Sequence, residues 1–134
     1  MFDLQLNNIN NPNNGKIIID DFSESLSCPI GYWNETDYIQ HWKKSLSRLF
    51  NGHERSALFT TMYDPKTSNF YDMWCFYLKE DVVYITNEIF FLNKIKGDFN
   101  IDDYYKYIDD LDKCEDDCSI WIMDKNNILK YINS

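Results

Sequence analysis

Residues Asn34 to Gly52 read NETDYIQHWKKSLSRLFNG, and they form the most regularly patterned stretch of the chain. Asn34 can cap a helix, and Glu35 and Asp37 place negative charge at its positive dipole end. The pattern predicts a helix over about residues 35–51 that ends before Gly52. Its buried face consists of apolar residues three and four positions apart: Tyr38, Ile39, Trp42, Leu46, Leu49 and Phe50.

Aromatic and β-branched runs follow this helix, and short polar turns separate them. The connections leave no room for crossover helices, so adjacent strands are expected to pair antiparallel. The predicted strands are Ala57–Tyr63, Phe70–Leu78 and Val82–Ile85, the last continuing to Phe91 if Asn87 and Glu88 form a bulge.

The ends of the chain add smaller elements. Residues 1–15 are predicted to form a polar, Asn-rich arm, with a short strand over Phe2–Leu6 as an alternative for its start. The other predicted elements are a strand over Ile17–Ile19, a short helix from Tyr104 to Leu111, a strand over Ser119–Met123 and a terminal helical turn around Ile128–Ile132. The pattern favours an α+β fold in which residues 1–134 form one domain, with a central antiparallel sheet and helices packed on it.

Composition excludes several classes of protein. The chain has 134 residues, of which 44% are hydrophobic and 17% aromatic, which rules out a disordered acidic tail. Its formal net charge of -9 argues against binding to nucleic acid or to an anionic membrane, because both would repel it. No signal peptide and no apolar run of about 18 residues is present, which predicts a cytoplasmic protein.

The charge is concentrated in an acidic segment, residues 98–124, which holds nine Asp and one Glu against two Lys, a net charge of -8. Repulsion among these negative charges lowers the stability of the fold, and a neutral arrangement would avoid that cost. We therefore expect this segment to bind a basic partner, with tyrosines as anchors. The alternatives are a solvated acidic face and a calcium site, although the central glycine of a calcium loop is missing. The candidate partner-binding residues are Asp102, Asp103, Tyr104, Tyr105, Asp109, Asp110, Asp112, Glu115, Asp116 and Asp117.

Catalytic, cofactor and metal motifs are missing from the sequence. The two histidines, His41 and His53, are interpreted as a helix-surface and a loop residue. No nucleophile elbow and no glycine-rich phosphate loop occurs, so we expect neither catalytic nor cofactor-binding residues. The cysteines form no CxxC pair, which argues against zinc and favours reduced thiols: they are Cys28, Cys75, Cys114 and Cys118. A small enzyme using Asp20, Asp21 and Glu24 with His41 is the minor alternative.

A set of short blocks resembles the immunity proteins of bacterial contact-dependent growth inhibition systems. The resemblance covers roughly residues 16–92, and the acidic segment is less similar. The blocks are Ile17–Phe22 (IIIDDF), Tyr32-Trp33, Asp37-Tyr38 with Trp42, Ser56–Leu58 and Met62–Pro65 (MYDP).

The resemblance implies a cytosolic antitoxin, without enzymatic activity, that binds the C-terminal toxin domain of such a system and blocks it. Many of those toxins are nucleases, often cutting transfer RNA, and they are basic because they grip phosphates. We therefore expect a one-to-one complex with a basic nuclease domain, and no direct contact with nucleic acid, membrane or cofactor. The alternatives are an acidic adaptor domain unrelated to toxins, and an interface elsewhere, around Asp20, Asp21, Trp33 and Asp64.

Overall fold

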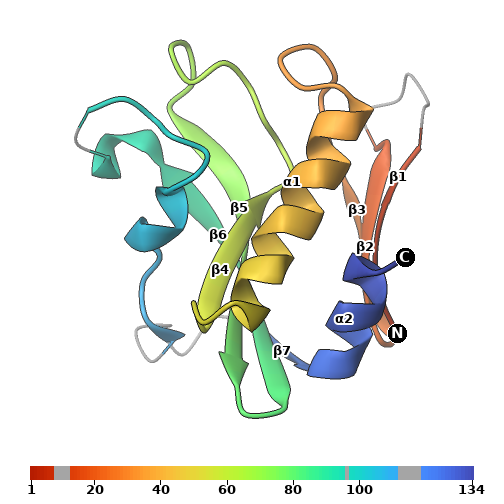
Figure 1. Ribbon diagram of the computed structural model, residues 1–134. Coiled ribbons are helices and arrows are strands. Elements are labelled where there is room, and N and C mark those ends of the chain that lie inside the picture. The colour runs from red at the N-terminus through yellow and green to blue at the C-terminus, as the bar shows by residue number, and fades with distance from the viewer. Residues whose placement is uncertain (8–12, 96, 112–118) are drawn as a thin grey trace.

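The computed structural model describes residues 1–7, 13–95, 97–111 and 119–134 (Figure 1). Within these residues the strands form two antiparallel sheets, in the orders β1-β2-β3 and β4-β5-β6-β7. The first sheet contains β1 (Phe2–Leu6), β2 (Gly15–Ile19) and β3 (Phe22–Leu26). The second contains β4 (Arg55–Phe59), β5 (Phe70–Lys79), β6 (Val82–Phe91) and β7 (Ile120–Asp124). The helices are α1 (Glu35–Ser47) and α2 (Lys125–Ile132), with 3-10 turns η1 (Arg48–Phe50), η2 (Leu92–Lys94) and η3 (Tyr104–Tyr107).

The α+β class is confirmed, but the prediction of one sheet is wrong. The strand predicted over Ile17–Ile19 is β2, after which the chain turns at Asp20 (φ 51°) and returns as β3, a strand that was not predicted. Ser23, Glu24 and Ser25 are exposed on this edge strand, so no apolar alternation marks it. The arm predicted for residues 1–15 likewise contains β1, the alternative considered for Phe2–Leu6.

Helix α1 begins as its sequence predicts. The Asn34 side chain accepts a hydrogen bond from the Asp37 backbone N–H, and the Asp37 carboxylate accepts one from the Asn34 N–H, both at 2.9 Å. This reciprocal pair is a capping box, which satisfies two backbone donors at the start of the helix. The helix tightens into η1 before Gly52, whose φ of +92° suits a residue without a side chain.

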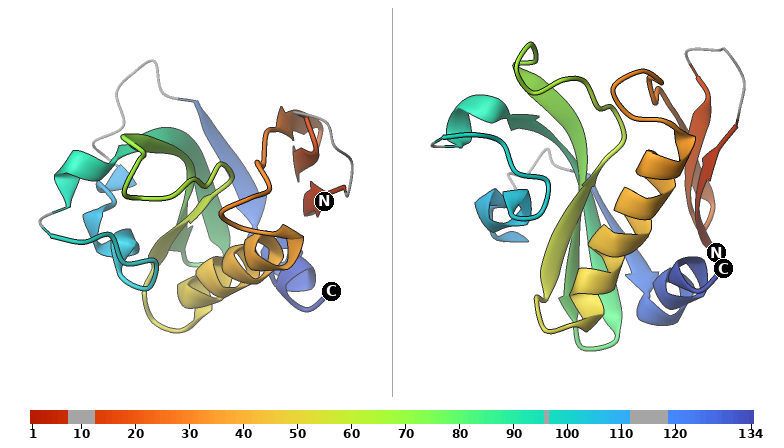
Figure 2. Two further views of the ribbon diagram at one scale, coloured as in Figure 1. Left: turned by 90° about the horizontal axis from the view of Figure 1, so that it is seen from above. Right: turned by 45° about the horizontal axis from the view of Figure 1, so that its top comes forward.

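The two sheets pack face to face around the core (Figure 2). The ring of Phe2 on β1 meets Phe76 on β5 edge-on at 5.9 Å. At the opposite edge, Phe22 on β3 lies 4.6 Å from Trp121 on β7. Because both Phe76 and Trp121 lie on the same face of the second sheet, that face is buried against the first sheet.

Helix α1 runs beside the edge strand β4 and holds the loops at one end of the molecule (Figure 1). Trp42 is fully buried, and its Nε1–H donates to the Phe59 carbonyl at 2.9 Å. The Tyr38 hydroxyl donates to the Pro29 carbonyl at 2.7 Å and accepts from the Met62 N–H at 3.1 Å. One helix side chain therefore fixes both the loop before α1 and the loop after β4.

The other predicted elements are present with shifted ends. Strand β4 stops at Phe59 rather than Tyr63, and β6 continues unbroken to Phe91. The predicted helix from Tyr104 to Leu111 is only the single turn η3, whereas the terminal helix α2 is longer than predicted. None of the helices in the described ranges has the length and apolar character needed to cross a membrane.

Candidate protein-binding site

The first half of the acidic segment, residues 98–111, lies over the face of the second sheet that the first sheet leaves free (Figure 1). Phe99 contacts the rings of Tyr71 and Phe59 at 5.5 and 5.9 Å, which attaches the segment to β5 and β4. Four predicted binding residues, Asp112, Glu115, Asp116 and Asp117, lie outside the described residues, as do Cys114 and Cys118.

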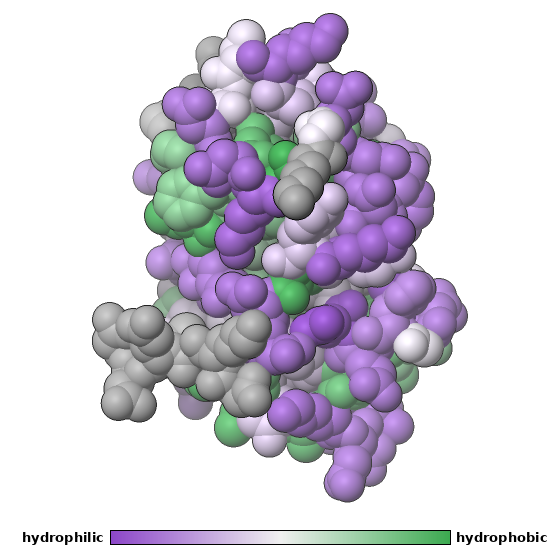
Figure 3. All heavy atoms as spheres, turned by 90° about the vertical axis from the view of Figure 1, so that its left-hand side faces the viewer, coloured by the Kyte–Doolittle hydropathy of each residue, from purple (hydrophilic) through white to green (hydrophobic). Residues whose placement is uncertain are grey.

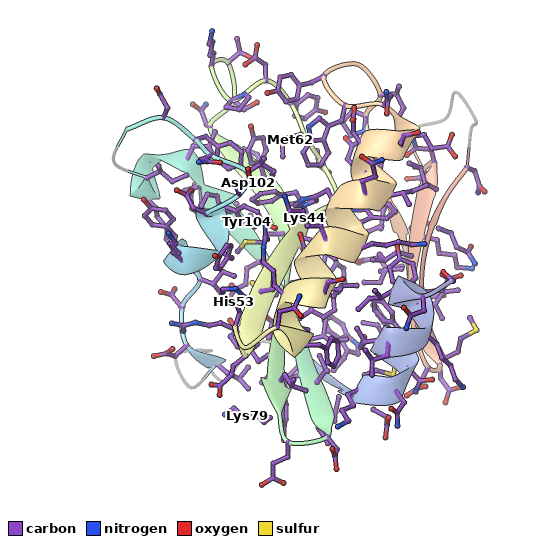
Figure 4. All side chains as sticks on the ribbon, in the orientation of Figure 1. Lys44, His53, Met62, Lys79, Asp102 and Tyr104 are labelled. Atoms are coloured by element: carbon purple, nitrogen blue, oxygen red, sulfur yellow. The ribbon has the colours of Figure 1, made fainter. Side chains whose placement is uncertain are left out.

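Tyr104 is the main attachment point of this segment, and its expected role at an interface is wrong. The side chain is fully buried, with its ring 4.5 Å from that of Phe59. Its hydroxyl hydrogen-bonds Ser45 at 2.9 Å and donates to the Ala57 carbonyl. Burial raises the pKa of this hydroxyl to about 12. The tyrosine is thus a core residue that joins the acidic segment to α1 and β4 (Figure 4).

Tyr105, the neighbouring candidate anchor, is half-buried against its own chain. The Arg48 guanidinium lies 4.5 Å from the centre of its ring, and the His53 ring meets it at 5.2 Å. A role for Tyr105 in partner binding stays a prediction.

Three of the candidate aspartates form ion pairs within the protein. Asp102 pairs with Lys44 at 2.8 Å, and Asp109 pairs with Lys94 at 3.6 Å. Asp110 pairs with Arg55 of β4. The Lys44 ammonium holds the pKa of the Asp102 carboxyl below its usual range. Exposed pairs of this kind add little to stability, but they neutralise part of the charge that a partner would meet.

Asp98 and Asp103 differ from those three, because neither forms an ion pair within the described ranges. Both line a hollow of about 490 Å³ whose walls include Tyr32, Trp33 and Phe99. A second hollow of about 500 Å³ shares Tyr32, Asp98 and Phe99 with the first and adds Asp64 and Lys66. We call these two joined hollows the loop groove.

The loop groove lies where three loops meet at the end of the molecule that carries Met62 (Figure 4). Tyr32 and Trp33 come from the loop before α1, Asp64 from the loop after β4, and Asp98 and Asp103 from the acidic segment. The side of the molecule at the left of Figure 1 is mostly hydrophilic, with hydrophobic areas among the polar side chains (Figure 3). Trp33 and Asp64 were predicted for an alternative interface, whereas Tyr32, Asp98 and Phe99 were not among the predicted binding residues. Adjacent large aromatics in a loop, Tyr32-Trp33, were the available signal.

His41 is a buried structural residue, not the helix-surface histidine that the sequence suggested. Its Nε2 accepts a hydrogen bond from the Phe59 N–H at 2.9 Å, so the ring must be neutral. Burial, assisted by the nearby charges of Arg48 and Lys44, lowers the pKa of His41 to about 3. Asp20, by contrast, pairs with the amino terminus at 2.6 Å in the turn before β3. The constellation proposed for a small enzyme is therefore not assembled.

The burial of His41 predicts that the free energy of unfolding of the protein falls as the pH is lowered. His41 binds a proton near pH 6.5 when unfolded but only near pH 3 when folded, so its contribution is complete above pH 6.5 and lost as the pH falls toward 3. Urea unfolding between pH 7 and 4 should show a smaller loss of stability for His41→Phe than for the wild type. His53→Ala, which changes an exposed histidine, is the control. Equal pH profiles for wild type and His41→Phe would contradict the assignment.

Metal binding gains no support from the geometry. In residues 1–7, 13–95, 97–111 and 119–134, no three His, Cys, Asp or Glu side chains are grouped to hold an ion. Cys28 and Cys75 are buried free thiols, and burial raises the pKa of each.

Comparison with known proteins identifies the fold's relatives. The family model for the CdiI N-terminal domain matches residues 28–131, more than three quarters of the chain. The chain belongs to the CdiI family. The family match includes the acidic segment, so the resemblance extends further than the blocks between residues 16 and 92 indicated. The resemblance to immunity proteins of contact-dependent growth inhibition is confirmed.

Two CdiI relatives are similar along most of their length. The immunity protein CdiI of Enterobacter cloacae subsp. cloacae is 33% identical over 121 residues, which is 88% of this chain and 83% of that protein. A chain in the solved CdiA-CT/CdiI toxin and immunity complex from Enterobacter cloacae superposes with a TM-score of 0.80 at 32% identity. That match covers 89% of this chain and 83% of the other. Membership in the CdiI family favours an immunity protein over an adaptor unrelated to toxins.

Proposed function

We propose that this protein binds the C-terminal toxin domain of a CdiA-type protein and blocks its activity. The observation that carries the proposal is the likeness, over 89% of the chain, to a protein solved within a toxin and immunity complex. The family match over residues 28–131 includes the residues of the loop groove and of the acidic segment, which supports these as the surfaces for binding.

The toxin we propose is a basic nuclease that cuts RNA, with transfer RNA as the first substrate to test. A nuclease must attract phosphates, so its binding surface is rich in Lys and Arg. The net charge of -9 on this chain complements such a surface and speeds the encounter by electrostatic steering. The inhibition takes place in the cytoplasm, where RNA lies.

The protein itself acts without chemistry in this proposal. A residue that transfers protons needs a pKa near the working pH, whereas burial lowers the pKa of His41 to about 3. A standard interface covers about 800 Å² on each partner, and the loop groove with the adjoining acidic segment is the one surface of this chain that we propose for the toxin. We therefore propose a one-to-one complex.

A titration tests this function. Increasing amounts of this protein are added to a fixed amount of its cognate CdiA-type toxin domain, with total bacterial RNA as substrate. Cleavage should stop at one equivalent, and this protein alone should leave the RNA intact. Gel analysis separates transfer RNA from larger RNAs and so identifies the substrate.

Two outcomes would count against parts of the proposal. Cleavage that persists at a several-fold excess would contradict stoichiometric blocking. Protection of cells from a toxin that cuts no RNA would support the immunity function and contradict the proposal that the toxin is a nuclease.

A further inference from the structure

We propose that the loop groove receives an arginine side chain of the toxin domain, a placement that rests on the proposed function. The charge of the groove is the first reason. Among the residues that the structure describes, Asp64, Asp98 and Asp103 line it against one cation, Lys66. Two nearby cations are already engaged, since Lys44 of α1 pairs with Asp102 and Arg48 of η1 lies over the Tyr105 ring.

The aromatic walls are the second reason. Tyr32 is 53% exposed, and Trp33 and Phe99, which line the same hollow, are half-buried. A guanidinium group stacks on aromatic rings and binds carboxylates with two parallel hydrogen bonds. An ammonium group shares the charge of arginine but neither its planar stacking nor its fork of donors. The combination of aromatic rings with carboxylates that have no ion pair among the described residues therefore favours arginine.

The rigidity of the groove is the third reason. Tyr38 holds the loops on two sides through Pro29 and Met62, and Tyr104 holds the acidic segment on the third. Side chains fixed in this way lose little conformational entropy when a partner binds. An arginine that binds phosphate in the free toxin would bind the carboxylates of the groove in the complex. Binding of this protein would therefore compete with binding of RNA to the toxin.

Paired variants with equal changes in charge test the placement. Asp98→Asn/Asp103→Asn removes two groove carboxylates of the acidic segment that form no ion pair with the described residues, and Asp109→Asn/Asp110→Asn removes two that already have partners. Calorimetric titration of the toxin domain should show a Kd at least tenfold higher for the groove pair and less than threefold higher for the control pair. Tyr32→Ala should also raise Kd at least tenfold, whereas Phe70→Ala, which changes another exposed aromatic, should not.

The toxin side provides an independent measurement. Each surface arginine of the toxin is replaced by lysine, and binding is measured to the wild-type protein and to Asp98→Asn/Asp103→Asn. One replacement should weaken binding to the wild type but have little further effect on the variant, as expected for residues in contact. Urea unfolding of every variant checks that the fold is retained.

The outcomes separate this inference from the proposed function. If the wild type binds no toxin domain, the proposed function fails. If the wild type binds but the groove pair changes Kd less than threefold, or the control pair weakens binding equally, only the groove assignment fails. Binding of Mg²⁺ by the free protein that is lost in the groove pair would also overturn it, because the carboxylates would then serve a cation site.

Discussion

Trp42→Ala is expected to lower the free energy of unfolding by about 3–5 kcal/mol. The side chain is fully buried in α1, where it packs beside Tyr38 and donates a hydrogen bond to Phe59. Alanine would leave a cavity between the helix and β4 and an unpaired carbonyl. Urea unfolding followed by circular dichroism measures the loss, which is a large share of the roughly 5–15 kcal/mol available to a domain.

An exposed aromatic residue provides the control for Trp42. Phe70 is 54% exposed at the start of β5, so Phe70→Ala should change the unfolding free energy by about 0.5 kcal/mol or less. A loss below about 1 kcal/mol for Trp42→Ala would show that α1 does not depend on this contact.

Tyr104→Ala is the second large effect, because it removes the residue that attaches the acidic segment to the sheet. We expect a loss of about 3–5 kcal/mol, as for other large aromatic truncations in a core. The variant should also bind the toxin domain more weakly, since Asp103 would lose its fixed place in the loop groove. Urea unfolding and calorimetric titration measure the two effects on one preparation.

Tyr104→Phe distinguishes a structural role from direct contact with the partner. This variant keeps the ring against Phe59 and removes only the hydroxyl that bonds Ser45 and Ala57, so it should lose about 1–3 kcal/mol. Toxin inhibition should remain complete while the protein is folded. Lost inhibition with unchanged stability would mean that Tyr104 contacts the toxin after all.

Local patterns predicted the elements that carry their own signals. The capping residue Asn34 and the apolar spacing around Trp42 located α1 to within a few residues. The short turn after Lys79 predicted the antiparallel pairing of β5 with β6. Strand β3 has no such signal, since exposed Ser23 and Ser25 form a strand only because β2 offers them backbone partners.

The candidate site could be predicted only in part. Charge counting located an acidic segment, and the composition predicted the sign of its partner. It could not separate Asp98 and Asp103 from Asp102 and Asp109, because pairing depends on where Lys44 and Lys94 lie in space. The same is true of Tyr104, whose sequence neighbours gave no indication that Phe59 would cover its ring.

The sequence by itself determined the α+β class, the position of α1 and the acidic character that favours a basic partner. These properties depend on composition and on contacts between residues close in the chain. The tertiary structure alone decided that the strands divide into two sheets, that His41 is buried, and that three loops enclose the loop groove. The physical reason is that burial and ion pairing arise between residues distant in the chain, which only packing brings together.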